Sequence, residues 1–255
     1  DSYFVESTMI PLTQDQLRTY GEVGHLTVGS VFSDRDMQAV TDDAEAWARQ
    51  ELAKLAPSDR AWYVETAIKE QDVSRKLDNP IYLRPAFRAL AANKTLLAMV
   101  EQLIGPDPTA FFSQLFFKAP GGGGPKPVHQ DNFYFGPNDN ESMVTVWIAL
   151  DDAEVSNGCL YYADGSNQGP VLPHTAPEGQ PFNLLIVDDI ARDYEMTPAP
   201  VPRGGISFHH GNTLHQSADN HSDRPRRACA IHYGNGRTEL LHSTLTYDPA
   251  VVISF

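Results

Sequence analysis

The chain has 255 residues, and its 41% hydrophobic and 20% charged content is ordinary for a soluble globular protein that buries a sizeable core. The formal net charge of −14 argues against nucleic acid or an anionic membrane surface as the main partner, because either would be repelled. A cationic substrate would suit this charge, but acidic soluble proteins are common and the balance alone identifies no ligand.

No stretch approaches the roughly 18 apolar residues of a membrane span, and the N-terminus lacks a basic region followed by an apolar one. We therefore expect a cytoplasmic protein that acts on a small molecule, with an oligomeric state that the sequence leaves open. Cys159 and Cys229 lack metal-type spacing. They are interpreted as small core residues in a reducing compartment, with a disulfide as the alternative.

The first hundred residues are predicted to be mostly helical, with one early strand. Residues 13–16 have the form of a capping box and open a short helix ending near Gly21, after which residues 24–29 form a strand. Ser33 caps a longer helix, and a further helix covers residues 94–104. Apolar residues follow helical spacing in the long helix, namely Met37, Val40, Ala44, Trp47, Ala48 and Leu52.

After Pro108 the pattern changes to short apolar or alternating runs separated by turn residues. Such spacing is typical of a sandwich or barrel and not of βαβ units. We expect a single domain, with a mostly helical wrap in residues 1–107 and a β core in residues 108–255. The predicted strands cover residues 110–118, 128–135, 143–150, 159–163, 205–210 and 228–233.

A histidine and an aspartate, His129 and Asp131, lie two residues apart in one predicted strand. In a strand, residues i and i+2 point to the same face, so the two side chains can converge on one point. With a second imidazole they would form the facial triad of non-haem Fe(II) oxygenases. The pair alone is a weak signal, because such pairs occur by chance and often only cap a turn.

The second imidazole must come from a distant strand, and residues 205–215 offer three candidates, His209, His210 and His215. His209 and His210 are adjacent and would face opposite sides of a strand, so at most one of them faces the site. At least two of the three are expected to be packing or hydrogen-bonding histidines. The remaining histidines are treated as background, namely His25, His174, His221, His232 and His242.

The residues that follow His215 point to a known family. Ser217, Asn220 and Ser222 continue a H-x-S-x-x-N-x-S pattern, and Arg226 lies eleven residues after the histidine. This pattern strongly resembles the phytanoyl-CoA dioxygenase-like family of Fe(II)/2-oxoglutarate oxygenases, and the resemblance covers about residues 110–235. Residues 145–152 and 157–160 also match family signatures, whereas residues 164–167 lack the usual histidine and proline.

The resemblance implies a double-stranded β-helix, or jelly-roll, core of cupin type. It implies Fe(II) held by His129, Asp131 and His215, with 2-oxoglutarate and O2 as cosubstrates. Arg226 would pair with the far carboxylate of 2-oxoglutarate, helped by Ser217, because a guanidinium matches a carboxylate with paired donors. A structural salt bridge is the alternative for Arg226. Further residues expected on the cosubstrate side are Gln114, Lys118 and Trp147.

The implied reaction decarboxylates 2-oxoglutarate to succinate and CO2 and hydroxylates, or otherwise oxidises, an unactivated C–H bond. Halogenating relatives carry a small residue in place of the carboxylate, so Asp131 argues against halogenation. Phe133, Tyr134 and Phe135 are candidates for substrate contact, and Phe133 should share the face of the metal pair. Candidates from the helical region, where packing is the main alternative, are Tyr63, Lys69, Arg75 and Tyr82.

Two other functions remain as alternatives at this point. One is a non-catalytic jelly-roll protein that binds a ligand, and the other is a metal-dependent jelly-roll enzyme that does not use 2-oxoglutarate. The second would leave Ser217 and Arg226 unexplained. Residues 121–124 are all glycine but lack a following Gly-Lys-Ser/Thr, so they predict a mobile loop at the pocket mouth and not a phosphate-binding loop.

Overall fold

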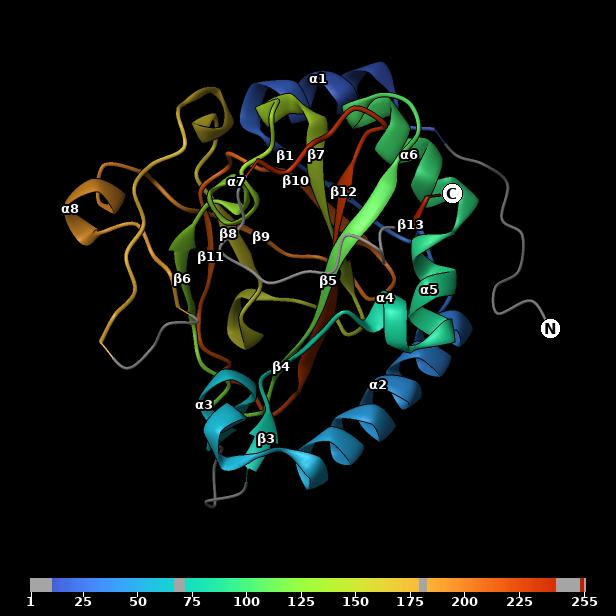
Figure 1. The fold of residues 1–255 in the computed structure, drawn as a ribbon, viewed down its shortest axis with the longest axis vertical. Helices are drawn as coiled ribbons and strands as arrows, with labels where there is room; N and C mark the ends of the chain where they lie inside the picture. The colour runs from blue at the N-terminus through green and yellow to red at the C-terminus, as the bar shows by residue number, and fades with distance from the viewer. Residues whose placement is uncertain (1–10, 67–71, 179–182, 242–252, 255) are drawn as a thin grey trace.

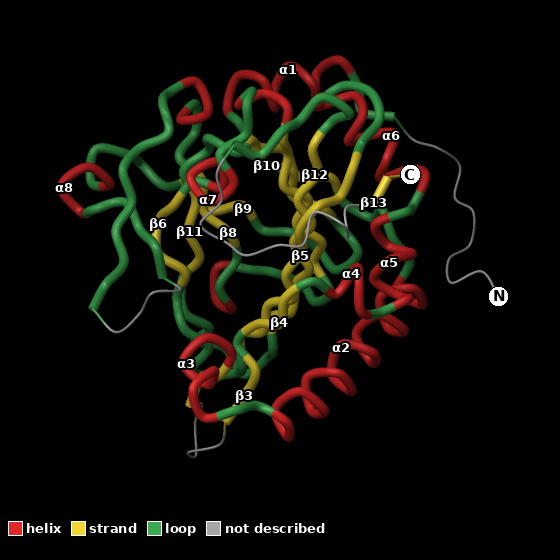
Figure 2. The backbone as a smooth tube through the Cα atoms, viewed as in Figure 1, coloured by secondary structure: helices red, strands yellow, loops and turns green. Residues whose placement is uncertain are grey.

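A computed structural model describes residues 11–66, 72–178, 183–241 and 253–254 of the chain. Two antiparallel sheets face each other, and helices cover the outer side of the larger one (Figure 1). The tube view shows how the strands gather in the centre, with long loops on the side of the smaller sheet (Figure 2). No helix in the described part of the chain is long and apolar enough to cross a membrane.

The larger sheet has the strand order β1-β10-β7-β12-β5-β13, and β4 also pairs with β5. The smaller sheet has the order β6-β11-β8-β9, and β2 pairs with β3 as a separate ribbon. The strands are β1 (His25–Val28), β2 (Val64–Thr66), β3 (Asp72–Ser74), β4 (Lys76–Asp78), β5 (Thr109–Lys118), β6 (Lys126–His129), β7 (Met143–Ala149), β8 (Leu160–Tyr162), β9 (Thr197–Ala199), β10 (Ile206–His210), β11 (His215–Ser217), β12 (Arg226–Gly234) and β13 (Ile253–Ser254).

Most helices precede the long strand β5 in the chain. The capping box at Thr13 is formed by both of its hydrogen bonds, and Ser33 caps the longest helix by accepting from the backbone N–H of Asp36. The helices are α1 (Gln14–Val23), α2 (Asp34–Lys54), α3 (Arg60–Tyr63), α4 (Pro80–Leu83), α5 (Pro85–Ala91), α6 (Lys94–Ile104), α7 (Asp131–Phe135) and α8 (Asp188–Ala191), with 3-10 turns at Pro57–Asp59, Asn140–Ser142, Val155–Asn157 and Ser166–Gln168.

The central strands of the larger sheet are buried on both faces, and on β12 two of the inward side chains are small. On β12, Ile231 and Tyr233 face the helices and join the main core, while Ala228 and Ala230 face the smaller sheet. Bulky outward residues give the helices apolar surface to bury. Small inward residues leave space between the sheets, and Ala230 lines the pocket found there.

Most of the predicted elements are confirmed, with shifts of a few residues at their ends. The first helix continues to Val23 because Gly24, in the left-handed conformation, provides its C-cap. One prediction is wrong: residues 128–135 are not one strand, because β6 ends at His129 and Asp131 begins the short helix α7. The N-terminal region also contributes strands β1 and β4 to the larger sheet, and the single-domain assignment stays a prediction.

We predict that packing of α5 against the larger sheet stabilises the whole fold. Phe87 on α5 is fully buried in the main core, so Phe87→Ala should lower the free energy of unfolding by about 3–5 kcal/mol. The matched control is Leu83→Ala on α4, where the side chain is 61% exposed and the change should stay within about 0.5 kcal/mol. Denaturant unfolding measures both, and equal losses would contradict this packing.

Candidate metal centre

Two histidines meet across neighbouring strands of the smaller sheet. His129 at the end of β6 is the register partner of His215 at the start of β11, and their ring centroids are 4.1 Å apart. Cross-strand partners hold their Cβ atoms close together, so pairing alone brings these imidazoles to one point. The structure thus brings together two of the predicted site residues that are 86 positions apart in the sequence.

Asp131 completes the group from α7. Its Oδ1 atom lies 3.7 Å from Nε2 of His129 and 3.7 Å from Nε2 of His215. The sequence predicted that His129 and Asp131 converge on one point, but the reason given, a shared strand, was wrong. The carboxylate turns toward the histidines because the backbone enters a helical turn after Gln130, not because the two residues share one face of a strand.

The two imidazoles are oriented by their backbone neighbours. Nδ1 of His129 lies 2.8 Å from the carbonyl oxygen of Pro127, and Nδ1 of His215 lies 2.9 Å from that of Thr213. Each Nδ1–H donates to its carbonyl, which leaves an unprotonated Nε2 facing Asp131. Burial lowers the pKa of both histidines, and for His129 repulsion from His215 lowers it further, so both rings are neutral at pH 7.

The second oxygen of Asp131 is held by the larger sheet. Oδ2 accepts hydrogen bonds from the Thr145 hydroxyl at 2.5 Å and from Nε2 of His209 at 2.9 Å. Burial by itself would raise the pKa of Asp131, but the attraction of His215 and the His209 hydrogen bond outweigh it and hold that pKa well below its usual range. Asp131 is therefore ionised, with Oδ1 left facing the two histidines.

A row of three residues supports this carboxylate. Thr145 on β7 is the register partner of His209 on β10 and of His232 on β12. Nδ1 of His232 donates to the Thr145 oxygen at 2.9 Å, and the Tyr162 hydroxyl donates to Nδ1 of His209 at 2.9 Å. Burial lowers the pKa of both supporting histidines to about 4, so each is neutral and each hydrogen bond has one donor and one acceptor.

The side chains of His129, Asp131 and His215 fit a divalent metal ion. The donor atoms of His129, Asp131 and His215 all lie within 4.8 Å of one another and all three residues are buried. Separations of 3.7 Å are within about twice the roughly 2 Å of a metal–ligand bond, and a pair of neutral imidazoles with one carboxylate is the donor set of non-haem iron sites. His210 does not contribute, because it points away toward Glu141.

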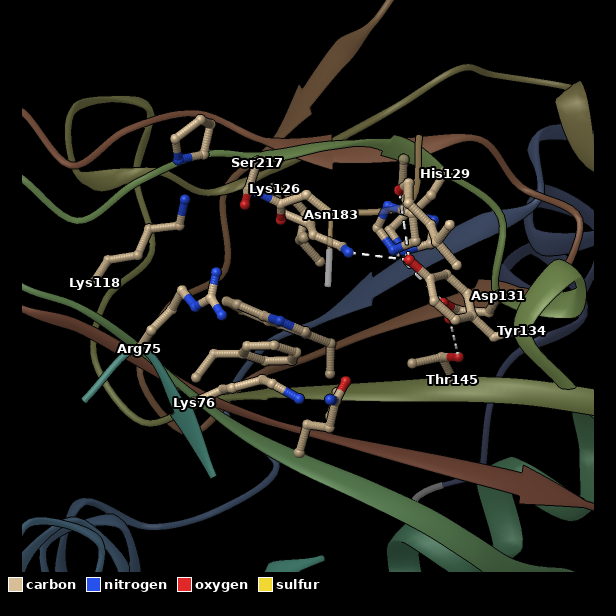
Figure 3. A pocket seen from close by; sticks show the side chains of 18 of the residues that line it. Arg75, Lys76, Lys118, Lys126, His129, Asp131, Tyr134, Thr145, Asn183 and Ser217 are labelled. Carbon is tan, nitrogen blue, oxygen red and sulfur yellow. Dashed lines mark hydrogen bonds and ion pairs between the residues drawn. The ribbon is translucent and has the colours of Figure 1, made fainter. Parts of the chain in front are cut away.

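The centre lies in a pocket between the sheets whose volume is about 160 Å³, far more than the roughly 10–15 Å³ that one water needs. His129, Asp131 and Thr145 lie toward one end, and Lys118 and Ser217 lie toward the other (Figure 3). Residues predicted for the cosubstrate side all line this pocket, namely Gln114, Lys118, Trp147, Ser217 and Arg226.

Arg226 is a buried cation, with its guanidinium 5.3 Å from the centre of the Trp147 ring. Its Nε has no hydrogen-bond partner, and no acidic side chain among the described residues forms an ion pair with it. Burial lowers its pKa to about 10, so it is still charged at pH 7. Arg224 and Arg227 differ, because they form ion pairs with Glu154 and with Asp151 and Glu45 respectively.

Lys118 lies beside this arginine, as its register partner on β5. Its Nζ donates to the carbonyl oxygens of Gly124, at 2.7 Å, and Ala218. Burial, and after it the charge of Arg226, lowers the pKa of Lys118 to about 6. The glycine loop packs tightly here, since a Cβ on Gly123 would lie 2.5 Å from the Lys118 backbone. Gly124 lines the pocket, and the mobility of this loop stays a prediction.

The structure changes the set of candidate substrate contacts. Phe133 does not share the face of the metal pair, because the helical turn of α7 directs it to stack on His174 at 4.1 Å. Tyr134 and Phe135 line the pocket instead. Arg75 also lines it, whereas the Tyr63 hydroxyl donates to Asp78 and the Tyr82 hydroxyl to the Phe111 carbonyl. Lys69 and His242 lie outside the described residues.

Sequence reasoning missed the residues that support the carboxylate. His232 was treated as background, yet it lines the pocket and contacts Thr145, while His174 and His25 hold Gln130 and Asp164. No spacing in the sequence marks these contacts, since they join segments far apart in the chain. The unusual residues 164–167 are not among those lining the pocket. Cys159 and Cys229 are free buried thiols, as expected.

Comparison with known proteins places this site in a family context. A family model described as phytanoyl-CoA dioxygenase matches residues 20–228. The peroxisomal phytanoyl-CoA dioxygenase of Bos taurus is 28% identical over 234 residues, which cover 88% of this chain and 69% of that protein. The phytanoyl-CoA dioxygenase domain-containing protein 1 of Mus musculus is 32% identical over 152 residues, covering 58% of this chain and only 52% of that relative.

A solved structure shares the fold. The non-heme alpha ketoglutarate dependent carbocyclase SnoK from nogalamycin biosynthesis superposes with a TM-score of 0.73 at 23% identity, covering 90% of this chain and 86% of the other. The predicted jelly-roll of antiparallel sheets with flanking helices is therefore confirmed.

We predict that His215→Ala abolishes metal binding, because it removes one of two imidazoles from the centre. Calorimetric titration with Co²⁺ should show saturable binding by the unaltered protein and none by this variant at the same concentrations. His210→Ala is the matched control, since it removes a buried neighbouring histidine that does not line the pocket. Loss of binding in the control with retention in His215→Ala would move the centre elsewhere.

We also predict that the Thr145 hydroxyl positions the metal ligand Asp131. Thr145→Val keeps the shape of the side chain but removes the donor to Oδ2, so Co²⁺ affinity should fall by about 10–100-fold. Thr145→Ser retains the hydroxyl and should restore most of the affinity. If the serine variant binds Co²⁺ as weakly as the valine variant, the methyl group matters and the hydrogen bond does not.

Proposed function

This chain belongs to the phytanoyl-CoA dioxygenase family of Fe(II)/2-oxoglutarate-dependent oxygenases, and from that premise we propose that it hydroxylates an unactivated C–H bond of a small-molecule substrate. In this proposal His129, Asp131 and His215 hold the iron and Arg226 holds 2-oxoglutarate. The observation that carries it is the presence, in one pocket, of a His–Asp–His group and a buried arginine that has no acidic partner among the described residues.

Arg226 is more specific evidence for 2-oxoglutarate than the metal-binding group is. A buried charge is costly unless an opposite charge or hydrogen bonds offset the lost solvation. Arg226 has a ring face from Trp147 but no carboxylate among the described residues. A dicarboxylate cosubstrate would supply the missing partner, with Ser217 lining the same pocket as a further donor. A structural salt bridge, the alternative for Arg226, therefore finds no support in the described part of the chain.

When bound, iron with 2-oxoglutarate and O2 supplies the oxidising power, and 2-oxoglutarate leaves as succinate and CO2. The protein's own residues have simpler tasks. Thr145 and His209 fix the carboxylate of Asp131, and neutral His129 and His215 present their Nε2 atoms. The apolar walls, which include Trp147 and Ala230, keep bulk water from the reacting carbon. No side chain is needed as a general acid or base.

The outcome of the oxidation depends on where the target carbon sits, and relatives differ in outcome. The fold neighbour SnoK is described as a carbocyclase and not as a hydroxylase. The carboxylate of Asp131 would serve as a third protein ligand and so argues against halogenation, and among the remaining outcomes we propose hydroxylation as the simplest. Asp131 is also locked by two hydrogen bonds, which disfavours its displacement.

Two other functions remain weaker candidates. A non-catalytic ligand-binding protein has no need for a carboxylate fixed by Thr145 and His209. A metal enzyme that does not use 2-oxoglutarate leaves Arg226 buried without an anion from the described part of the chain.

We predict that Fe(II) and 2-oxoglutarate, added without O2, give the weak visible charge-transfer band of their chelate. Arg226→Met should raise the 2-oxoglutarate dissociation constant at least about 30-fold, because truncating one partner of a buried charge pair costs roughly 2 kcal/mol or more. Arg224→Met is the control with the same charge change, since its exposed ion pair with Glu154 lies outside the pocket lining. Absence of the band in the unaltered protein, or an unchanged dissociation constant in Arg226→Met, would overturn the cosubstrate assignment.

A further inference from the structure

The short helix α7 begins with the metal ligand Asp131, and the first backbone N–H groups of a helix need partners from outside it. The N–H of Asn132 donates to the carbonyl oxygen of Gly211 at 2.9 Å. The N–H of Gln130, a fully buried residue, donates to Nε2 of His174 at 2.9 Å. The turn that aims Asp131 at the two histidines is therefore held by contacts with Gly211 and His174.

The imidazole of His174 makes three contacts that fix its orientation. Its Nδ1–H donates to the carbonyl oxygen of Leu172 at 2.8 Å, which leaves Nε2 unprotonated and able to accept from Gln130. Its ring stacks on Phe133 of α7, with the centroids 4.1 Å apart and the planes at 18°. Any aromatic ring could provide the stacking, so the nitrogen acceptor is the feature for which the turn depends on this side chain.

The side chain of Gln130 fastens the same segment a second time. Its amide nitrogen donates to the carbonyl oxygens of Pro170, at 3.1 Å, and Asn212, at 2.7 Å. Its amide oxygen accepts from the N–H of Leu172 at 2.7 Å. Both amide hydrogens and the oxygen thus have partners, as a buried amide requires. Residues 170–174 are therefore attached directly to the residue that precedes Asp131.

The chain continues from His174 into a wall of the pocket. Thr175 and Leu185 exchange backbone hydrogen bonds of 2.9 and 2.8 Å, so the two segments that contain them lie side by side. Leu184, the neighbour of Leu185, lines the pocket together with the metal ligands. The imidazole of His174 thus links the turn that carries Asp131 to a surface that a ligand in the pocket would touch.

We propose that His174 is a positioning residue for Asp131, and that it couples the metal centre to the pocket wall at Leu184. It acts through Gln130 and Phe133, one before and one after Asp131 in the chain. This rests on the proposed function, because Asp131 must be a metal ligand. Coupling between two sites is reciprocal, so a bound metal must in turn stabilise the contacts of His174 and of the wall.

Two substitutions separate the hydrogen bond of His174 from its stacking. His174→Phe keeps a ring against Phe133 but removes the acceptor, and it should weaken Co²⁺ binding about tenfold, the lower end of what outer partners of metal ligands contribute. It should also change the visible absorption spectrum of bound Co²⁺, because that spectrum reports the arrangement of the ligands. His174→Gln keeps an acceptor for the N–H of Gln130 and should retain most of the affinity and the unaltered spectrum.

Ser33→Ala is the matched control, since Ser33 also accepts from a backbone N–H at a helix start but belongs to α2 and does not line the pocket. A general loss of stability would appear in both variants, whereas only His174→Phe should alter the Co²⁺ spectrum. An unchanged spectrum in His174→Phe, or equal losses of affinity in the phenylalanine and glutamine variants, would overturn the proposal. Absence of Co²⁺ binding by the unaltered protein would instead remove the metal centre, and the proposed function with it.

Hydrogen exchange tests the coupling to the wall. In the unaltered protein, saturating Co²⁺ should slow exchange of the N–H groups of Leu172, Thr175 and Leu185, which are hydrogen-bonded within this set of contacts. In His174→Phe, also saturated with Co²⁺, this slowing should be lost. If Co²⁺ leaves exchange of these groups unchanged in the unaltered protein, or slows it equally in the variant, the wall and the metal centre are independent and the proposal is wrong.

Discussion

The carboxylate of Asp131 is the point on which the rest of the site depends, because it joins the two sheets. One oxygen faces the histidines of the smaller sheet, and the other accepts hydrogen bonds from Thr145 and His209 of the larger sheet. The donors come from the smaller sheet and α7, whereas the larger sheet supplies the residues that fix the carboxylate. The orientation of Asp131 therefore depends on how the sheets face each other, and a shift between them would separate it from Thr145 and His209.

Strand pairing explains how ordinary packing places the site residues next to one another. His209, Thr145 and His232 are register partners across β10, β7 and β12, and His215 is the partner of His129 across β11 and β6. A slip of one residue in either ladder would turn these side chains to the opposite face. In the larger sheet the apolar outer face prevents that slip, because it would expose core residues now buried against the helices. Core packing and site geometry are thus maintained by the same register.

The sequence predicted most helices and strands and the three candidate metal ligands, but not the contacts that support those ligands. Capping residues such as Thr13 and Ser33 act locally, so the helix starts could be predicted. His215 was identified by resemblance to a family, since nothing local distinguishes it from His209. The turn at Asp131 and the role of His232 could not be predicted, because both depend on partners that only the tertiary structure brings near.

The net charge of the chain said little about the ligand, because the charges near the pocket differ from those of the whole molecule. A total of −14 describes the field far from the molecule, whereas ionic solution screens charges beyond about 8 Å at physiological strength. Within that distance, a ligand in the pocket meets the buried guanidinium of Arg226, which has no ion pair with an acidic side chain among the described residues. An acidic exterior around a buried arginine therefore slows the approach of anions without weakening their final contact with that arginine. Such an arrangement favours ligands that fit the pocket over anions that merely pass near the surface.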